Sequence, residues 1–192
     1  MSNKKDILEN IRRHINTQYE MPDIDIQGIQ YADKTAQFIE ISKSVGGEAI
    51  IHDGKNDINE LIKTLYPKAK TIASNLPDIS LTTINPDDVQ SPHDLNGIDL
   101  AIIEGELGVA ENGCVWIPQN VKEKVIYFIA EYLIIILDRN NIVNNMHEAY
   151  NQLKFNDYGF GVFISGPSKT ADIEQALVVG AHGAKGVTVI LK

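Results

Sequence analysis

The C-terminal stretch from Ile164 to Lys192 constrains the fold more than any other part of the chain. Its sequence, ISGPSKTADIEQALVVGAHGAKGVTVILK, combines an apolar start, a Gly-Pro loop, a middle of helical composition, a glycine-rich turn and an apolar end. Pro167 lacks a backbone N–H and Gly166 tolerates unusual backbone angles, so this loop ends a strand. We predict that a helix follows Thr170, which would cap it, with acidic residues in its first turns. The stretch therefore predicts one β-loop-α-β unit.

Helical and strand patterns alternate through much of the remaining chain. Helices are predicted at residues 4–20, 34–44, 57–66 and 142–153, from apolar residues at helical spacing. Strands are predicted at residues 49–51, 71–73, 98–103, 115–117, 125–128, 132–137, 160–164 and 187–191. Residues 76–96 are predicted to be a surface loop with a short helix near its end, and residues 105–113 a compact turn region. This order predicts an α/β fold, with a mostly parallel sheet flanked by helices and an antiparallel extension in the strand-rich middle.

The length of 192 residues suits a single domain with a substantial core. Residues 1–20 are expected to form an N-terminal packing helix, because Ile7, Leu8, Ile11 and Ile15 lie on one stripe. That stripe could pack on the domain or on a partner. Residues 21–192 are expected to form one α/β domain.

Charge and cysteine content exclude several classes of protein. The net charge of −9 predicts no general affinity for nucleic acid or for an anionic membrane. Cys114 is the one cysteine of the sequence, so an intramolecular disulfide and any multi-cysteine zinc or iron–sulfur site are excluded within this chain. The N-terminus lacks the apolar core of a signal peptide, and no apolar run reaches transmembrane length. We therefore expect a cytoplasmic protein with no membrane insertion.

Three carboxylates lie close together in the sequence after a predicted buried strand. Glu104, Glu106 and Glu111 occur within the stretch EGELGVAENGC. Ligand sites in open α/β sheets lie at strand ends, and carboxylates held close together raise one another's pKa. Glu111 is therefore a candidate general acid, general base or nucleophile. The alternative is that these are solvated loop residues and that Asn112-Gly113 is an ordinary turn.

The loop from Ser165 to Thr170 is a candidate anion site, because hydroxyls, a lysine and a predicted helix N-terminus together suit a carboxylate or a phosphate. Its spacing matches neither the Walker loop nor the Gly-x-Gly-x-x-Gly pattern. A capped helix with solvent-facing polar residues is the alternative. The candidate ligand-binding residues are Asn112, Gly113, Ser165, Gly166, Ser168, Lys169, Thr170 and His182.

His182 is predicted to lie at the end of the final helix, where the helix dipole favours a protonated imidazole. It could bind a ligand or simply stabilise the helix end. The other four histidines are scattered without metal-ligand spacing, so no metal site is predicted.

Because Glu111 and Ser165 both follow predicted strands, we expect the two motifs to face one pocket at a common sheet edge.

These motifs resemble those of the lactate-utilisation (LUD) domain proteins, and among them the C-type subunit. Residues 165–174, SGPSKTADIE, are similar to the C-terminal signature of that family, and the sequence GAHG at 180–183 and the apolar strand at 187–191 also fit it. Residues 108–113, GVAENG, are similar to its upstream signature, which usually contains Ala-Glu-Thr-Gly. The chain has Asn112 where the family has threonine, and Ala184-Lys185 where it has proline and arginine.

The resemblance implies the fold shared by glucosamine-phosphate isomerases, ribose-phosphate isomerases and coenzyme A transferases. It implies that residues 21–192 are a LUD-type domain, acting as an accessory or substrate-binding component of a system that oxidises L-lactate to pyruvate with iron–sulfur partner subunits. The expected ligand is a small carboxylate or a phosphorylated metabolite. No flavin, nicotinamide or iron–sulfur motif occurs in the sequence, so the cofactor is unknown.

Two alternatives remain open, and they decide whether the chain is itself an enzyme. Residues 110–113, AENG, are similar to the Ser-Glu-Asn-Gly motif of coenzyme A transferases, which implies acyl transfer through Glu111. The other alternative is a non-catalytic subunit that binds a small carboxylate or a sugar phosphate.

Overall fold

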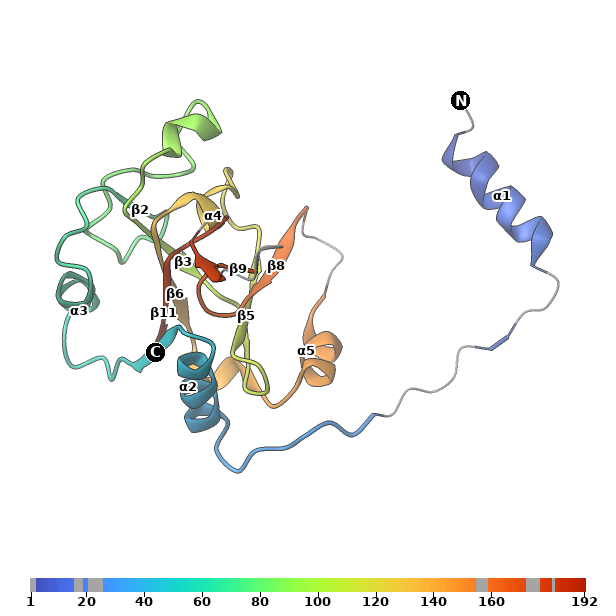
Figure 1. Cartoon of the computed structure of the whole chain (residues 1–192), viewed down its shortest axis with the longest axis horizontal. Helices are drawn as coiled ribbons and strands as arrows, with labels where there is room; N and C mark the ends of the chain where they lie inside the picture. Colours follow the sequence, from blue (N-terminus) through green and yellow to red (C-terminus); the bar gives the residue numbers. More distant parts are fainter. Residues whose placement is uncertain (1–2, 16–18, 21–25, 155–158, 172–176, 181) are drawn as a thin grey trace.

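A five-stranded parallel sheet forms the centre of the protein, in the order β1-β11-β6-β3-β2 (Figure 1). The structure is a computed structural model that describes residues 3–15, 19–20, 26–154, 159–171, 177–180 and 182–192. The bounds of these strands, in sheet order, are Glu48–Ile51, Gly186–Leu191, Tyr132–Leu137, Leu100–Glu104 and Ile72–Ala73. This sheet confirms the predicted α/β class with a mostly parallel sheet.

The central strands are buried on both faces, as their apolar sequences require. In β11, Ile190 pairs with Ile50 of β1 on one side and with Ile136 of β6 on the other. Ile190 is fully buried and Ile136 almost so. Because parallel strands need covered faces, these runs of isoleucine, leucine and valine can only lie between other layers.

A second, mixed sheet has the order β7-β4-β5-β8 and confirms the predicted antiparallel extension. Its strands, in sheet order, are Ile142–Val143, Leu107–Val109, Cys114–Pro118 and Gly161–Ile164. β4 lies within the predicted turn region 105–113, so that region forms half of a hairpin instead. The apolar run at 160–164 is typical of a strand covered on both faces, and the burial predicted from it is wrong. β8 is the edge strand of this sheet, and its residues are half-buried.

Helices α2 (Lys34–Ser44) and α3 (Ile58–Leu65) match their predicted positions. α2 buries Phe38 completely in the same core cluster as the second sheet. α3 packs Ile58 and Ile62 against the opposite face of the parallel sheet. Each helix begins at an aspartate, Asp33 or Asp57, whose side chain accepts a hydrogen bond from a backbone amide of the first turn.

Two local predictions are wrong. Residues 125–128 were expected to form a strand, but Ile126–Ile129 form a single helical turn, α4. A short apolar run cannot distinguish the two states, and here the turn buries Ile126 and Tyr127 in the core. The helix predicted at 142–153 begins only at Met146 (α5, Met146–Gln152), because Asn145 caps it and the preceding residues pair as β7. Short 3₁₀ helices lie at Pro92–Leu95, as predicted near the end of the long loop, and at Arg139–Asn141.

The helix predicted after Thr170 is also wrong. Strands β9 (Lys169–Ala171) and β10 (Leu177–Val179) pair in antiparallel fashion in its place, and residues 172–176 lie outside the described part of the chain. The β-branched pair Val178-Val179 favours a strand over a helix. In its described residues the C-terminal unit therefore consists of β8, a loop, the antiparallel strand pair β9–β10 and the final strand β11.

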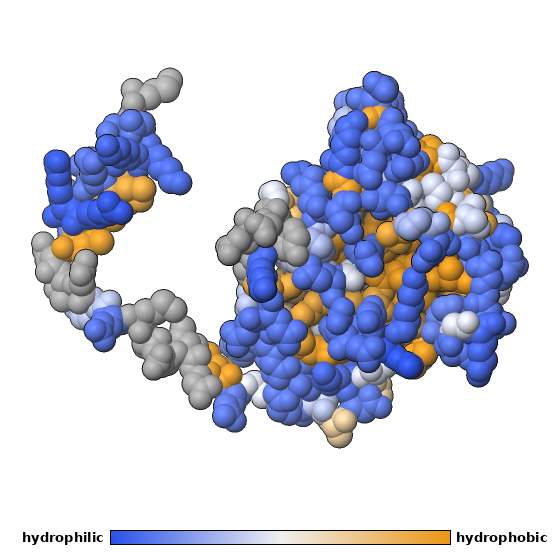
Figure 2. Space-filling model, turned by 180° about the vertical axis from the view of Figure 1, so that it is seen from behind, coloured by the Kyte–Doolittle hydropathy of each residue, from blue (hydrophilic) through white to orange (hydrophobic). Residues whose placement is uncertain are grey.

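Helix α1 (Lys4–His14) is shorter than predicted, because Ile15 has an extended backbone and ends it. Asn3 and Asp6 form a complete capping box at its start. None of its residues is buried, and Figure 1 shows it away from the two sheets. Its apolar stripe forms an exposed hydrophobic band in Figure 2. The packing role expected for this helix stays a prediction.

Helices of the described residues are all too short or too polar to cross a lipid bilayer.

Candidate functional site

The two sequence motifs lie in direct contact. The Ser165 hydroxyl, at the end of β8, donates a hydrogen bond of 2.8 Å to the backbone carbonyl of Asn112, in the turn between β4 and β5. The turn closes where the Gly113 amide donates to the Val109 carbonyl at 2.9 Å, with Gly113 at a φ of 67°. The hydrogen bond confirms that the two motifs lie close together, and the expectation that they face one pocket stays a prediction. Their contact belongs to the second sheet and the end of α2, and not to an edge of the parallel sheet.

The loop after Ser165 packs tightly against the C-terminal end of α2. Gly166 has a φ of 61°, and a Cβ atom there would lie 2.8 Å from the Val45 carbonyl oxygen. A Cβ atom on Gly47 would lie 3.2 Å from the Gly166 Cα and 3.1 Å from the Val187 carbonyl oxygen. Three backbone segments therefore meet at a point where only glycine fits. Gly166 of the C-terminal motif therefore allows the loop to pack closely against the end of α2.

Lys169 binds the end of α2 as well. Its ammonium group donates a hydrogen bond to the carbonyl of Val45, the C-cap residue of that helix. A cation at this position satisfies a carbonyl that the helix leaves unpaired and offsets the negative end of the dipole. The helix N-terminus on which the predicted anion site depended is replaced by strand β9. The ligand-binding role of Lys169 stays a prediction, with that support removed.

The other predicted residues of this motif extend to the start of β11. The Ser168 amide donates to the Ala184 carbonyl at 2.9 Å, and the Ser168 carbonyl accepts from Gly180 at 3.0 Å. His182 is exposed and lines an open hollow of about 420 Å³ with Phe128 and Lys185. Because β10 precedes His182, the argument from a helix dipole does not apply to it.

Thr170 lies in β9 opposite Val178. Its side chain is outside the described part of the structure.

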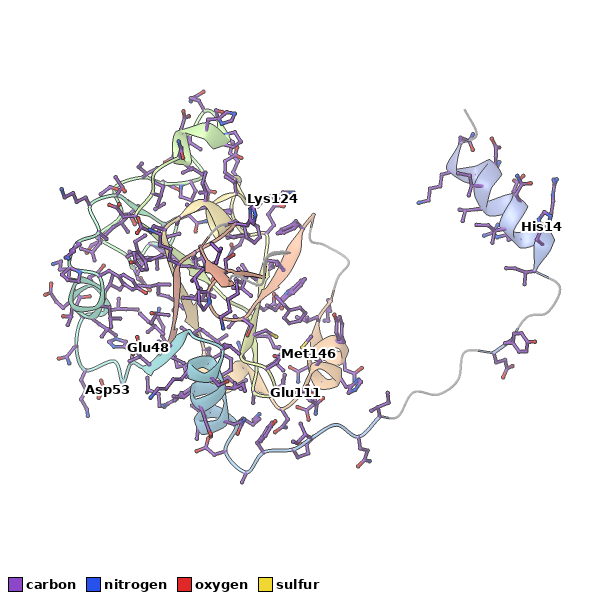
Figure 3. The ribbon with its side chains drawn as sticks, viewed as in Figure 1. His14, Glu48, Asp53, Glu111, Lys124 and Met146 are labelled. Carbon is purple, nitrogen blue, oxygen red and sulfur yellow. The ribbon has the colours of Figure 1, made fainter. Side chains whose placement is uncertain are left out.

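Glu111 lies in the turn between β4 and β5, and its carboxylate contacts the start of α5. Its carboxylate Oε2 accepts a hydrogen bond of 3.0 Å from the Met146 amide, and its own amide donates to the Asn144 carbonyl at 2.9 Å. The carboxylate is otherwise exposed, and Figure 3 shows it beside Met146. Glu104 lies at the end of β3, so the hairpin strand β4 separates it from Glu111. The three glutamates therefore do not form one cluster.

Asn112 makes a local turn, since its side-chain oxygen accepts from the Cys114 amide at 3.2 Å.

A polar network that was not predicted from the sequence lies next to Glu111. The Asn144 side chain donates to Gln30 at 2.7 Å, and its side-chain oxygen accepts from the Tyr31 amide at 2.9 Å. The Asn144 amide and the Gln30 side chain donate to Glu148 at 2.8 and 2.6 Å. Partial burial raises the pKa of Glu148, but these hydrogen bonds outweigh it and leave the pKa below its ordinary value. The network fastens the segment before α2 to α5.

Cys114 is buried beneath this turn, with its sulfur 3.6 Å from that of Met146. Burial raises the pKa of the Cys114 thiol to about 12.

Because the thiolate is the reactive form, alkylation of Cys114 by iodoacetamide at pH 8 should be about a thousandfold slower in the folded protein than in urea. The rate should rise with pH up to that pKa. Equal rates in the folded and unfolded states would show that the thiol is accessible and reactive.

The described residues contain no group of three or more His, Cys, Asp or Glu side chains that could hold a metal ion.

Sequence comparison identifies the family. The model of the LUD domain family matches residues 87–191, which is more than half of the chain. The chain therefore belongs to the LUD domain family.

Curated relatives point to one branch of that family. A "Lactate utilization protein C" of Shouchella clausii is 33% identical over 114 residues, which cover 56% of this chain and 49% of the relative. A protein of the same name from Geobacillus thermodenitrificans is 29% identical over 152 residues, covering 72% of this chain and 59% of the relative. The chain thus spans about half the length of the curated relatives it matches.

A solved structure shows the same fold. The crystal structure of a DUF162 family protein from Deinococcus radiodurans superposes with a TM-score of 0.60 at 13% identity, covering 85% of this chain and 99% of that one. At this identity the likeness supports the fold alone.

Proposed function

We propose that this protein is an accessory or substrate-binding component of a system that oxidises L-lactate to pyruvate. The observation that carries the proposal is the family match over residues 87–191, together with relatives named lactate utilization protein C. Contact between the two signature motifs supports it, because the chain retains both signatures in one folded unit.

The proposal includes iron–sulfur partner subunits, because oxidation of lactate to pyruvate removes two electrons and two protons. A single cysteine cannot supply the several thiolate ligands that an iron–sulfur cluster needs. An electron acceptor must therefore come from a bound cofactor or from a partner, and we favour the partner.

Affinity purification tests this proposal. Tagged protein from cells grown on L-lactate is expected to bring down an iron–sulfur protein, and less of it from cells grown on glucose. The chain purified alone is expected to show no lactate-dependent dye reduction. A purified chain that carried its own flavin or nicotinamide and oxidised lactate would overturn the accessory role.

Acyl transfer through Glu111 is a second candidate, favoured by the exposure of its carboxylate at the tip of a hairpin. In that reaction a Glu111 oxygen attacks the carbonyl carbon of an acyl thioester, the C–S bond breaks and coenzyme A thiolate leaves, which forms an acyl-glutamyl anhydride. The thiolate then attacks the glutamyl carbonyl of this anhydride. The acyl group leaves as the free acid, and a glutamyl thioester with coenzyme A remains on Glu111.

Glu111→Gln should abolish exchange between acyl-CoA and labelled carboxylates if this second candidate is correct, because the amide is a poor nucleophile. Glu104→Gln is the matched control, since Glu104 is exposed and lies on a different strand. The measurement is isotope exchange over a panel of acyl thioesters. Absence of exchange by the unsubstituted protein would reject acyl transfer.

A further inference from the structure

The parallel sheet has a crevice at its carboxyl edge that neither sequence motif reaches. Strand β1 leads into α3, which packs on one face of the sheet. Strand β6 leads through a 3₁₀ turn into β7, whose Ile142 belongs to the core on the other face. The chain thus leaves the sheet toward opposite faces on either side of β11. Open α/β sheets bind ligands at such a topological switch point.

Hydrogen bonds hold the three strand ends side by side. The His52 amide donates to the Leu191 carbonyl at 2.8 Å, and the Lys192 amide donates to the Leu137 carbonyl at 2.9 Å. The Arg139 amide donates to the Lys192 carbonyl at 3.2 Å. Three residues with cationic or titratable side chains therefore come from three adjacent strand ends: His52, Arg139 and Lys192.

These side chains line an open hollow of about 510 Å³. Its polar residues are His52, Asp53, Asp57, Asp78, Arg139 and Lys192. Figure 3 shows Asp53 at this edge, well apart from Glu111. The hollow was not predicted from the sequence, because the glutamates after β3 are the conspicuous polar residues at a strand end, whereas the ends of β1, β6 and β11 meet only in the folded sheet.

Some charged side chains of the hollow have a partner within the protein and others have none. Asp53 forms an ion pair of 3.0 Å with Lys55, and the Asp57 carboxylate accepts two hydrogen bonds of 2.9 Å from Asn59. Within the described part of the chain, the Arg139, Lys192 and His52 side chains have no ion-pair or hydrogen-bond partner. The Asp78 carboxylate likewise has none. Beside the engaged carboxylates of Asp53 and Asp57, the hollow therefore offers two unpaired cationic donors, one imidazole and one unpaired carboxylate acceptor.

We propose that this hollow binds a small hydroxylated anion, with the oxyanion at Arg139 and Lys192 and a hydroxyl at Asp78 or His52. The guanidinium fork suits a carboxylate or a phosphate, and a carboxylate acceptor suits a hydroxyl that donates to it. A 2-hydroxy acid and a sugar phosphate share this chemistry. The choice of L-lactate as the 2-hydroxy acid rests on the proposed function, whereas the ligand class rests on the hollow alone.

Titration calorimetry and thermal unfolding of the full chain test the site, with L-lactate, pyruvate, acetate and ribose 5-phosphate as probes. L-lactate or ribose 5-phosphate is expected to bind and to raise the unfolding temperature. Pyruvate and acetate, which lack a hydroxyl donor, are expected to bind more weakly. Arg139→Ala should raise the Kd about tenfold or more, and Arg139→Lys should raise it less because the charge remains.

Two controls keep the test specific. Arg12→Ala removes an arginine from α1, outside the hollow, and should leave the Kd unchanged. Asp78→Ala should reduce the preference for L-lactate over acetate. Binding of ribose 5-phosphate without L-lactate would support the site and contradict lactate as its ligand.

Absence of binding by every probe, or binding that Arg139→Ala does not weaken, would overturn the site. If the hollow bound no probe but cells still required the protein for growth on L-lactate, the proposed function would be supported and only the proposed binding site would be rejected.

Discussion

Phe38→Ala is expected to lower the free energy of unfolding by about 3–5 kcal/mol, the range for truncating a fully buried aromatic side chain. Phe38 is completely buried in the core between α2 and the sheets, and its ring edge approaches Gly108 of β4 closely enough that a Cβ there would lie 3.3 Å away. Urea unfolding, followed by circular dichroism, measures the loss.

Phe128→Ala is the matched control for this substitution. The Phe128 side chain is 38% exposed, so its removal leaves a smaller cavity and should cost clearly less. If both substitutions cost the same, or if Phe38→Ala costs less than about 1 kcal/mol, then α2 does not anchor the core as described.

Gly166→Ala is expected to lower the free energy of unfolding by about 2–5 kcal/mol, because two penalties act together. The left-handed backbone, with a φ of 61°, disfavours any residue with a Cβ atom by about 1–2 kcal/mol. The added methyl group would also lie 2.8 Å from the Val45 carbonyl oxygen, and accommodating such an overlap costs about 1–3 kcal/mol. The measurement is again the free energy of unfolding in urea.

Gly97→Ala separates the two penalties. Gly97 has a φ of 78°, and a Cβ atom there would meet nothing within 4 Å, so only the backbone term applies. Gly166→Ala should therefore be the more destabilising substitution. Equal losses would show that the C-terminal loop is not clamped against the end of α2.

Most of the fold could be predicted from the sequence, because long buried strands and well-capped helices carry strong local signals. Apolar runs identified β3, β6 and β11, and apolar residues at helical spacing identified α2 and α3. Short elements were less predictable. Residues 126–129 and the paired strands β9 and β10 depend on tertiary contacts that override local preference, and apolar β-branched residues suit either state.

The candidate site was only partly predictable. The sequence indicated that the turn at Asn112 and the loop at Ser165 would lie together, and their hydrogen bond confirms it. It could not indicate that Lys169 would bind the end of α2, because that partner is distant in sequence. It also could not show that the ends of β1, β6 and β11 lie side by side, since strand order is a property of the whole fold.

Growth on L-lactate tests the central claim, that this LUD-domain protein serves lactate utilisation, most directly. A strain that lacks only this protein should grow slowly on L-lactate as sole carbon source and normally on glucose. Expression of the unsubstituted chain should restore growth and lactate consumption. Unchanged growth on L-lactate, with lactate consumed at the original rate, would contradict the account.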